Sequence, residues 1–201
     1  MMEQGADRFC SLCGELCSLV VPEGDDRVRQ VCRGCSTVHY ENPRIVVGAF
    51  VLDAGRLLAC RRAIEPRKGL WTCPGGFMEC EESMAAAATR ETWEEAMARI
   101  RVLGPVATID LPHIHQVHAF FRAELAEPGA SPGPESLEVD WFPLESLTSR
   151  EWAFPVMEQA LRWWCGDPEG TSFHQARLDW DGRGPRYDLE SYTLGEHWCA
   201  G

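Results

Sequence analysis

The sequence lacks a long hydrophobic run, and it lacks an excess of positive charge. Its longest apolar stretch, residues 45–52, is far shorter than the ~20 residues that a membrane-spanning helix needs. Residues 1–7 contain neither the basic nor the apolar segment of a secretion signal, so we expect a cytoplasmic protein with no membrane partner. Nineteen Lys and Arg face 31 Asp and Glu, a net charge of −12. This balance opposes capture of nucleic acids through their phosphates, and we expect no nucleic-acid partner.

Internal repeats and low-complexity tracts are also absent. The 201 residues are 45% hydrophobic and 25% charged, which is ordinary globular usage, and the length suits one domain with a small appendage. Changes of pattern along the chain predict three segments, residues 1–40, 41–166 and 167–201. The last segment carries no recognisable motif and its role is unknown. Its aromatic residues predict that it packs on the core or on a partner.

Cysteine, in contrast, is abundant, with ten residues in the chain. Without a secretion signal, cysteines are more often metal ligands or buried thiols than disulfides. Two C-x2-C turns separated by 18 residues have the spacing of a tetrahedral zinc site; their cysteines are Cys10, Cys13, Cys32 and Cys35. Four thiolates close the coordination shell, so we expect a structural zinc ribbon that metal binding largely stabilises. Cys17 and His39 are expected to be bystanders.

Strand and helix signals alternate after residue 42 and predict an α/β fold. Apolar and β-branched runs between turn signals indicate strands at 45–52, 56–62, 102–111, 116–125 and 139–142. An Ala-rich segment without Gly or Pro, 82–98, indicates a helix with Ser83 near its start. Apolar spacing indicates a second helix at 155–165. Strands interleaved with helices favour a layered sandwich.

Three acidic side chains gather on one face of the first predicted helix. Glu91, Glu94 and Glu95 are spaced i, i+3 and i+4, which places them within a wedge of about 100°. Carboxylates this close repel one another unless cations lie between them, and hard divalent ions such as Mg²⁺ prefer oxygen ligands. A solvated acidic face is the alternative. The preceding Gly-Gly loop and the counter-charge of Arg90 favour a cation site instead.

The residues around this helix resemble the Nudix box, G-x5-E-x7-R-E-U-x-E-E-x-G-U. The matching residues are Gly76, Glu82, Arg90, Glu91, Glu94 and Glu95. Two positions depart from the pattern. Thr92 replaces an apolar residue, and we expect its hydroxyl to bond back to the preceding turn. Met97 replaces the glycine that commonly ends the helix in a left-handed conformation, so we expect a cost of about 1 kcal/mol or a longer helix.

The resemblance extends over about residues 8–165. The cysteine pairs and the segment 39–48 are similar to the Nudix subgroup with an N-terminal zinc ribbon. Segments 69–72, 90–96 and 132–138 are similar to the plant chloroplast pyrophosphatases of FAD and ADP-ribose and to their bacterial relatives. The resemblance implies a Nudix-type α/β/α sandwich with a mixed sheet, preceded by the small zinc ribbon.

The resemblance also implies the residues of a catalytic site. Glu91 and Glu95 would be the principal Mg²⁺ or Mn²⁺ ligands, helped by the carbonyl of Gly75. Glu94 would be a metal ligand, or a catalytic carboxylate that accepts a hydrogen bond just outside the ligands. Glu82 would lie outside the ligands or be an additional ligand. Arg90 would orient the carboxylates. Such cations would offset the local negative charge, hold a diphosphate and lower the pKa of an attacking water.

The general base is left open between the box and a later loop. Glu138 is the loop candidate and Glu135 the second, with a solvated loop carboxylate as the alternative for both. Arg62 is a candidate phosphate contact, or one member of a solvated basic face. Three histidines could touch substrate, although isolated histidines are more often structural; they are His113, His115 and His118.

We therefore expect divalent-metal-dependent hydrolysis of a nucleoside diphosphate derivative, most simply ADP-ribose or FAD, with release of AMP. An NAD(H) pyrophosphatase is an alternative, although residues 98–121 lack the S-Q-P-W-P-F-P-type motif of those enzymes. A non-catalytic Nudix-fold sensor that binds a nucleotide is a further alternative, which Met97 favours and the intact carboxylates oppose. The resemblance also suggests a homodimer.

Overall fold

The computed structural model describes residues 8–167, 169–180 and 184–193. The chain divides into two compact units, Met1–Asn42 and Pro43–Gly201, and each is described by itself. None of the helices in the described ranges combines the length and the hydropathy that crossing a membrane requires.

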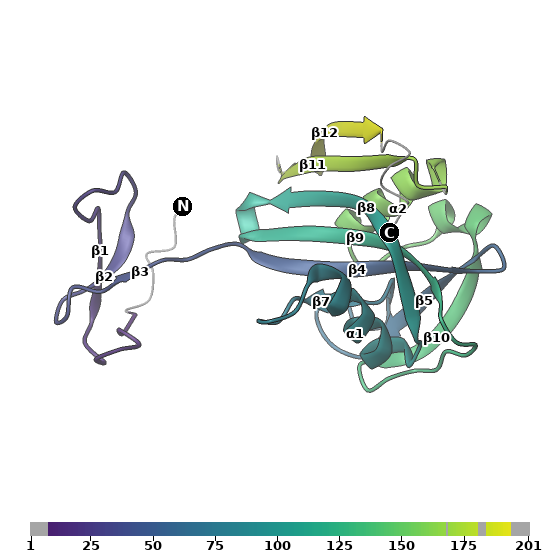
Figure 1. Ribbon diagram of the computed structural model, residues 1–201, viewed down its shortest axis with the longest axis horizontal. Helices are drawn as coiled ribbons and strands as arrows, with labels where there is room; N and C mark the ends of the chain where they lie inside the picture. Colours follow the sequence, from purple (N-terminus) through teal and green to yellow (C-terminus); the bar gives the residue numbers. More distant parts are fainter. Residues whose placement is uncertain (1–7, 168, 181–183, 194–201) are drawn as a thin grey trace. The chain divides into compact units, whose positions relative to one another are not determined.

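The first unit is a small antiparallel sheet with a cysteine-lined interior. Strands β1 (Cys17–Val20), β2 (Arg29–Cys32) and β3 (Val38–His39) lie in that order (Figure 1). The Asp25 carboxylate accepts the backbone N–H of Arg27 and pairs with the Arg29 guanidinium at 2.9 Å, which shapes the turn between β1 and β2. The buried hydrophobic cluster of this unit consists of Cys10, Cys17 and Cys32. So small an interior provides little apolar burial for stability.

The second unit is built on a nine-stranded mixed sheet. The central order is β10-β5-β4-β9-β8-β11-β12, with β6 paired to β5 and β7 paired to β4. The pairs β4·β9 and β8·β11 are parallel, and the others are antiparallel. The strands are β4 (Arg44–Asp53), β5 (Arg56–Arg62), β6 (Trp71–Thr72), β7 (Gly75–Phe77), β8 (Ile100–Leu111), β9 (Gln116–Leu125), β10 (Ser136–Pro143), β11 (Ser172–Trp180) and β12 (Pro185–Thr193).

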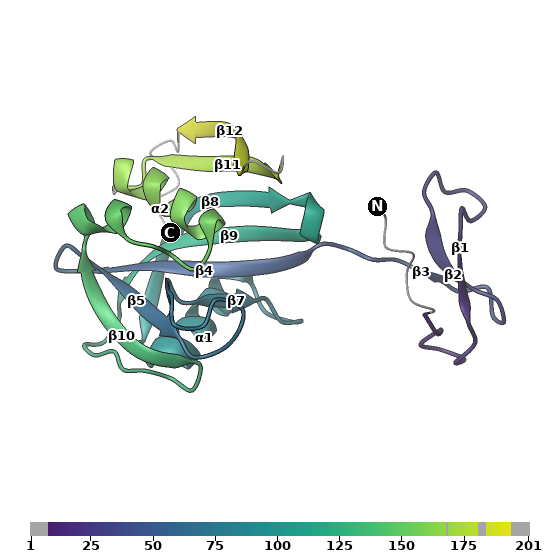
Figure 2. The same ribbon diagram turned by 180° about the vertical axis from the view of Figure 1, so that it is seen from behind.

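Helices cover both faces of this sheet, which confirms the predicted sandwich. Side chains alternate along β4, so Val47, Ala49 and Val51 join the core cluster under helix α1 (Met84–Ala96). Phe50 points to the other face and packs against Trp164 of helix α2 (Pro155–Gly166), with ring centroids 5.5 Å apart. Helix α1 lies on the near side of the sheet in Figure 1, and α2 on the near side in Figure 2. Short 3₁₀ turns span Pro112–Ile114 and Leu144–Ser149.

Helix α1 begins and ends at residues that the sequence singles out. The Ser83 hydroxyl accepts the backbone N–H of Ala86 at 3.1 Å and caps the first turn. Thr92 is fully buried and donates its hydroxyl to the Ala88 carbonyl at 2.7 Å, as expected. Met97 adopts φ +49° in the left-handed region, so the helix stops at Ala96 and does not continue to residue 98. The structure therefore does not show the longer helix. It shows Met97 in the left-handed conformation that the box glycine commonly adopts.

The C-terminal segment extends the sheet. Strand β11 adds in parallel to β8 through His174–Arg177, and β12 pairs with β11. Its Tyr187 ring contacts Trp163 of α2 edge-on, at 6.0 Å between centroids, and Tyr187 donates its hydroxyl to the Pro155 carbonyl. The expected aromatic packing on the core is thus confirmed for Tyr187. The side chains of Trp180 and Tyr192, and all of Trp198, lie outside what the structure describes.

Candidate active site and zinc site

The four predicted cysteine ligands converge at one point of the first unit. Their sulfurs all lie within 4.8 Å of one another, with separations of 3.4 Å between Cys13 and Cys32 and 3.7 Å between Cys10 and Cys35. Four sulfurs at ~2.3 Å from a tetrahedral zinc ion would lie about 3.8 Å apart. The donor set and its spacing therefore fit zinc, and all four cysteines are free of disulfides.

Neighbouring groups complete this cysteine cluster. His39 Nε2 lies 3.3 Å from Cys10 Sγ, so the expected bystander touches a ligand atom. The Thr37 hydroxyl lies 3.1 Å from Cys35 Sγ, and hydrogen bonds from Thr37 lower the pKa of Cys35 to about 6. The Leu12 backbone N–H points at Cys10 Sγ at 3.4 Å. Such donors stabilise thiolates, the form that binds metal.

In the second unit, Arg90 gathers three of the predicted carboxylates. Its Nη1 donates to Glu91 Oε1 at 2.8 Å and to Glu94 Oε2 at 3.0 Å. Its Nε and Nη2 grip both oxygens of Glu82 at 3.1 and 2.7 Å. Nη2 also donates to the Phe77 carbonyl at 3.0 Å, which ties β7 to α1. Because all these bonds are charge-assisted, they fix the carboxylates in one arrangement.

The loop before the helix closes the other side of this arrangement. The Gly75 backbone N–H donates to Glu95 Oε2 at 2.9 Å. A Cβ atom at Gly76 would lie 2.6 Å from the Glu91 carboxylate, so any larger residue there would displace that carboxylate. Strand β7 is thereby held against α1, with Glu91 and Glu95 on the face that looks toward the loop. The sequence predicts a loop at Gly75 and Gly76, whereas the structure places both in the short strand β7, where they pair with Gly48 and Val47 of β4.

Burial sets the electrostatics of these carboxylates. Glu95 is 5% exposed, and burial raises its pKa to about 7 despite the hydrogen bond from Gly75. Burial also raises the pKa of Glu91, although Arg90 opposes the shift. Glu82 behaves in the opposite way, because hydrogen bonds from Arg90 lower its pKa. Glu91 and Glu95 are adjacent carboxylates shielded from solvent, and their oxygens are hard donors. Together they form a site that suits a divalent cation, which would in turn stabilise their charged forms.

The candidate bases lie at different places. Glu138 is on β10, where it is half exposed and pairs with Arg61 at 3.5 Å. Glu135 is on the preceding loop, and its negative charge adds to the upward pKa shifts of both Glu91 and Glu95. The loop that carries Glu135 meets α1 at the Glu95 carbonyl, and Glu138 has a partner on β5.

Arg62 is the cation that faces the cluster from the sheet. Its positive charge lowers the pKa of Glu95 against the larger effect of burial. Its Nε donates to the Pro66 carbonyl at 2.9 Å, and its guanidinium lies over the Phe154 ring at 5.0 Å. The Pro66 carbonyl and the Phe154 ring thus hold the Arg62 guanidinium in place, whereas the sequence is equally consistent with a solvated basic face.

The three histidines do not form a cluster of ligands. His113 is exposed, and His115 ends the 3₁₀ turn in a left-handed conformation. His118 is largely buried on β9, where Nε2 lies 2.9 Å from the Gln116 amide oxygen, and burial lowers its pKa to about 4. The His118 imidazole is therefore neutral at physiological pH.

The turn residues at 127–135 predict a loop, but sequence reasoning did not predict that this loop covers the end of α1. Ser131 and Gly133 donate their backbone N–H groups to the carbonyls of Ala96 and Glu95 at 2.8 and 3.0 Å. The helix carbonyls that lack partners within the helix are thereby satisfied. The Pro-Gly-Pro run at 132–134 signals an ordered turn, but it does not indicate which helix that turn meets.

A sandwich with a carboxylate-lined helix and a zinc ribbon defines the class of this protein. The profile of the NUDIX domain family matches residues 42–164, and that of the Nudix N-terminal zinc ribbon matches residues 8–41. The chain therefore belongs to the Nudix hydrolase family.

Relatives and solved structures agree with this assignment. The chain is 26% identical over 162 residues to the NAD-capped RNA hydrolase NudC of Chromobacterium violaceum, covering 79% of this chain and 58% of the relative. It is 26% identical over 129 residues to the ADP-ribose pyrophosphatase of Methanocaldococcus jannaschii, covering 62% and 76%. The crystal structure of a Nudix hydrolase from Nitrosomonas europaea superposes with a TM-score of 0.76 at 41% identity, covering 81% and 92%. The chain spans little more than half of the NudC relatives.

Proposed function

We propose that the protein hydrolyses the diphosphate bond of a nucleoside diphosphate derivative, with ADP-ribose or FAD as substrate and AMP as a product. The observation that carries the proposal is the set of carboxylates that Arg90 and Gly75 hold beside one another on α1. The similarity to an ADP-ribose pyrophosphatase supports the choice of substrate.

Each residue has a distinct part in the proposed reaction. Glu91 and Glu95, with the Gly75 carbonyl, would hold Mg²⁺ or Mn²⁺, and such an ion would supply Lewis acidity toward the phosphates and toward a water. Glu94, half exposed at the edge of the cluster, completes the ligand set or accepts from the water. Arg90 orients the carboxylates, and Glu82 fixes Arg90. Arg62 donates to a phosphate oxygen, where developing negative charge needs a cation.

Glu135 is the loop residue that we place first as general base. Its loop contacts α1 at the Glu95 carbonyl and its negative charge raises the pKa of Glu91 and Glu95, whereas Glu138 already pairs with Arg61. A base must reach the proton it removes, directly or through one water. We therefore expect Glu135→Gln to lower kcat more than Glu138→Gln does, by about tenfold or more.

The test is a substrate panel with a matched control. The purified protein is incubated with Mg²⁺ or Mn²⁺ and FAD, ADP-ribose or NADH, and the products are separated. Glu95→Gln should lower kcat by at least about 100-fold, since even partners behind metal ligands are worth 10–100-fold. Glu158→Gln on α2, whose carboxylate pairs with Arg162 at 2.7 Å, should leave turnover unchanged. Equal activity of the parent and Glu95→Gln would refute the proposal.

A second candidate substrate comes from the NudC relatives. Their printed function, hydrolysis of NAD-capped RNA, favours an NAD-type substrate, and the expectation of no nucleic-acid partner stays a prediction. Adding NAD-capped RNA to the panel tests both points. Exclusive release of AMP and NMNH from NADH would reverse our order of substrates. If the parent protein binds a nucleotide without hydrolysing it, and Glu95→Gln binds it with the same affinity, the non-catalytic sensor is favoured.

A further inference from the structure

The loop between β9 and β10 meets α1 at the backbone of two candidate metal ligands. Gly133 donates its N–H to the Glu95 carbonyl at 3.0 Å, and a Cβ atom at Gly133 would lie 1.7 Å from the Glu94 carbonyl oxygen. No other residue could approach the helix so closely. Two residues later the loop carries Glu135, whose carbonyl accepts the Ala63 N–H at 2.8 Å. The seating of this loop therefore sets where the Glu135 carboxylate lies.

The other end of the loop is fastened by a cation. The Arg99 guanidinium lies over the Trp93 ring of α1 at 4.5 Å from the centroid. Its Nε also pairs with Glu127 Oε2, at the start of the loop, at 3.5 Å. The Arg99 carbonyl accepts the Ala126 N–H at 2.8 Å. One side chain thus joins the outer face of the metal-binding helix to the loop that carries Glu135.

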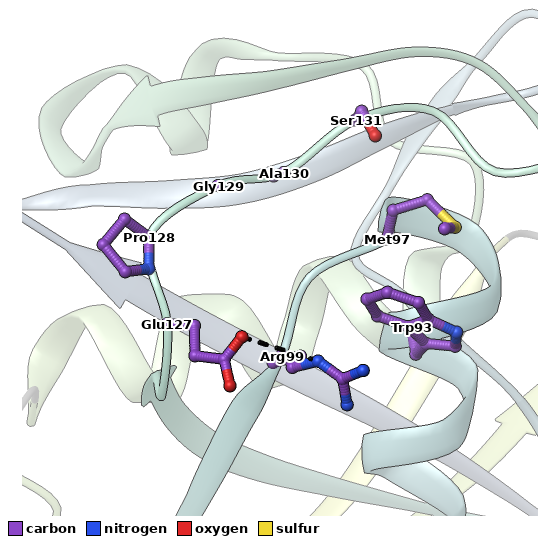
Figure 3. Close-up of a pocket in the computed structure, with 8 residues that line it drawn as sticks. All are labelled: Trp93, Met97, Arg99, Glu127, Pro128, Gly129, Ala130 and Ser131. Atoms are coloured by element: carbon purple, nitrogen blue, oxygen red, sulfur yellow. Dashed lines mark ion pairs between the residues drawn. The ribbon is translucent and has the colours of Figure 1, made fainter.

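These groups line a pocket of about 310 Å³ on the surface at the end of α1 (Figure 3). Met97 extends beside Trp93 in Figure 3, and Ala130 and Ser131 form part of the opposite wall. The Trp93 and Met97 side chains are 38% and 37% exposed. The loop and the helix are therefore not packed together throughout, which leaves Arg99 as a specific link across an open gap.

We propose that Arg99 is a positioning residue that holds the loop 127–135 on α1 and thereby positions Glu135, which follows the Gly133–Glu95 contact by two residues. The proposal rests on the proposed function for its effect on turnover, but its structural part does not. A cation–π contact and an exposed ion pair are each modest, so their joint loss should open the loop more often without unfolding the domain.

The test compares Arg99→Gln with a matched control two residues further along the chain, on β8. Arg101 pairs with Glu124 across β8 and β9, outside the loop 127–135. Amide hydrogen exchange of Ser131 and Gly133 should become about tenfold faster in Arg99→Gln. It should stay within about twofold of the parent in Arg101→Gln. Arg99→Lys, which keeps the charge without the planar guanidinium, should give an intermediate rate.

Kinetics then ask whether the link serves the reaction. In Arg99→Gln, kcat should fall about tenfold while KM changes less than about twofold, because substrate binding groups are untouched. Unchanged exchange in Arg99→Gln, or an equal rise in Arg101→Gln, would overturn the proposal. Faster exchange with an unchanged kcat would also overturn the positioning role. If the parent hydrolyses nothing in the panel, the proposed function fails, while the exchange data still decide whether Arg99 holds the loop.

Discussion

The two units of this chain are stabilised in different ways. The zinc ribbon buries three cysteines as its apolar interior and leaves large side chains such as Phe9, Leu12 and Leu19 more than half exposed. The Nudix unit buries two clusters, one on each face of its sheet, with Phe50, Leu57 and Leu58 fully enclosed. Metal ligation can substitute for a core in a unit too small to bury one. Chelation should therefore affect one unit and core truncation the other.

The largest expected effect is the loss of a zinc ligand, which should unfold the ribbon and leave the Nudix unit folded. Cys32→Ser should unfold the ribbon, because structural zinc contributes about 10–16 kcal/mol in small zinc domains. All eight tryptophans follow residue 42, so tryptophan fluorescence reports the Nudix unit, whose melting temperature should change little. Zinc content and amide spectra of the ribbon provide the other readout. Cys17→Ser, buried but outside the four ligands, should keep one zinc per chain. A ribbon that stays ordered in Cys32→Ser would contradict the comparison.

Truncation of apolar side chains should give the reverse pattern. Phe50 is fully buried, and Phe50→Ala should cost the Nudix unit about 3–5 kcal/mol in urea unfolding followed by tryptophan fluorescence. Leu19 is 58% exposed on the ribbon, and Leu19→Ala should change stability by less than about 0.5 kcal/mol. The stability of the ribbon in Leu19→Ala is measured by the rate at which the protein loses zinc to a chelator. Rapid zinc loss in Leu19→Ala would show that the ribbon relies on apolar contacts after all.

Acid should weaken the Nudix unit through a buried histidine. Burial lowers the pKa of His118 to about 4, whereas an unfolded histidine titrates near ~6.5. The unfolded state therefore binds the proton first as pH falls, and stability decreases between pH ~6.5 and ~4 by up to about 3 kcal/mol. His118→Gln should flatten this part of the pH profile in fluorescence-detected unfolding. The exposed control His113→Gln should keep the slope, and an unchanged slope in both variants would count against His118.

The smallest effect concerns a single backbone conformation. Met97 has φ +49°, which costs a residue with a side chain about 1 kcal/mol relative to glycine. Met97→Gly should therefore be about 1 kcal/mol more stable than Met97→Ala, since both variants lose the Met97 side chain beyond Cβ and differ mainly in the cost of the left-handed conformation. Thermal unfolding of the pair measures the difference. Equal stability would mean that the end of α1 relaxes when the side chain is removed.

Local patterns were enough to predict much of this molecule. Strands 56–62 and 116–125 and the first helix follow from apolar periodicity and the Ser83 cap, and the cysteine spacing predicts the thiol cluster. Strands β11 and β12 were not predicted, although Ala176, Leu178 and Trp180 alternate with polar residues. Period-two alternation in so acidic and Gly-rich a segment is a weak signal.

The parts of the site that sequence did not predict depend on contacts between distant segments. Glu95 meets the Gly75 amide, the charge of Arg62 and the loop at Gly133, from three different elements. Nothing in the residues around Glu135 and Glu138 indicates which of them faces the helix, because the answer depends on how β10 pairs with β5. The side chain of Arg99 likewise finds Trp93 and Glu127 only once the loop has folded back.

Strand β11 also has a consequence for shortened versions of the protein. Its parallel pairing places β8 inside the sheet. A chain that stops after α2 would leave the outer side of β8 with open amide and carbonyl groups, next to the apolar Ala107 and Ile109. Such an edge invites strand-to-strand association. The last two strands therefore protect the edge of the sheet from aggregation. A version shortened to residue 164, where the family match ends, should be less soluble than the full chain.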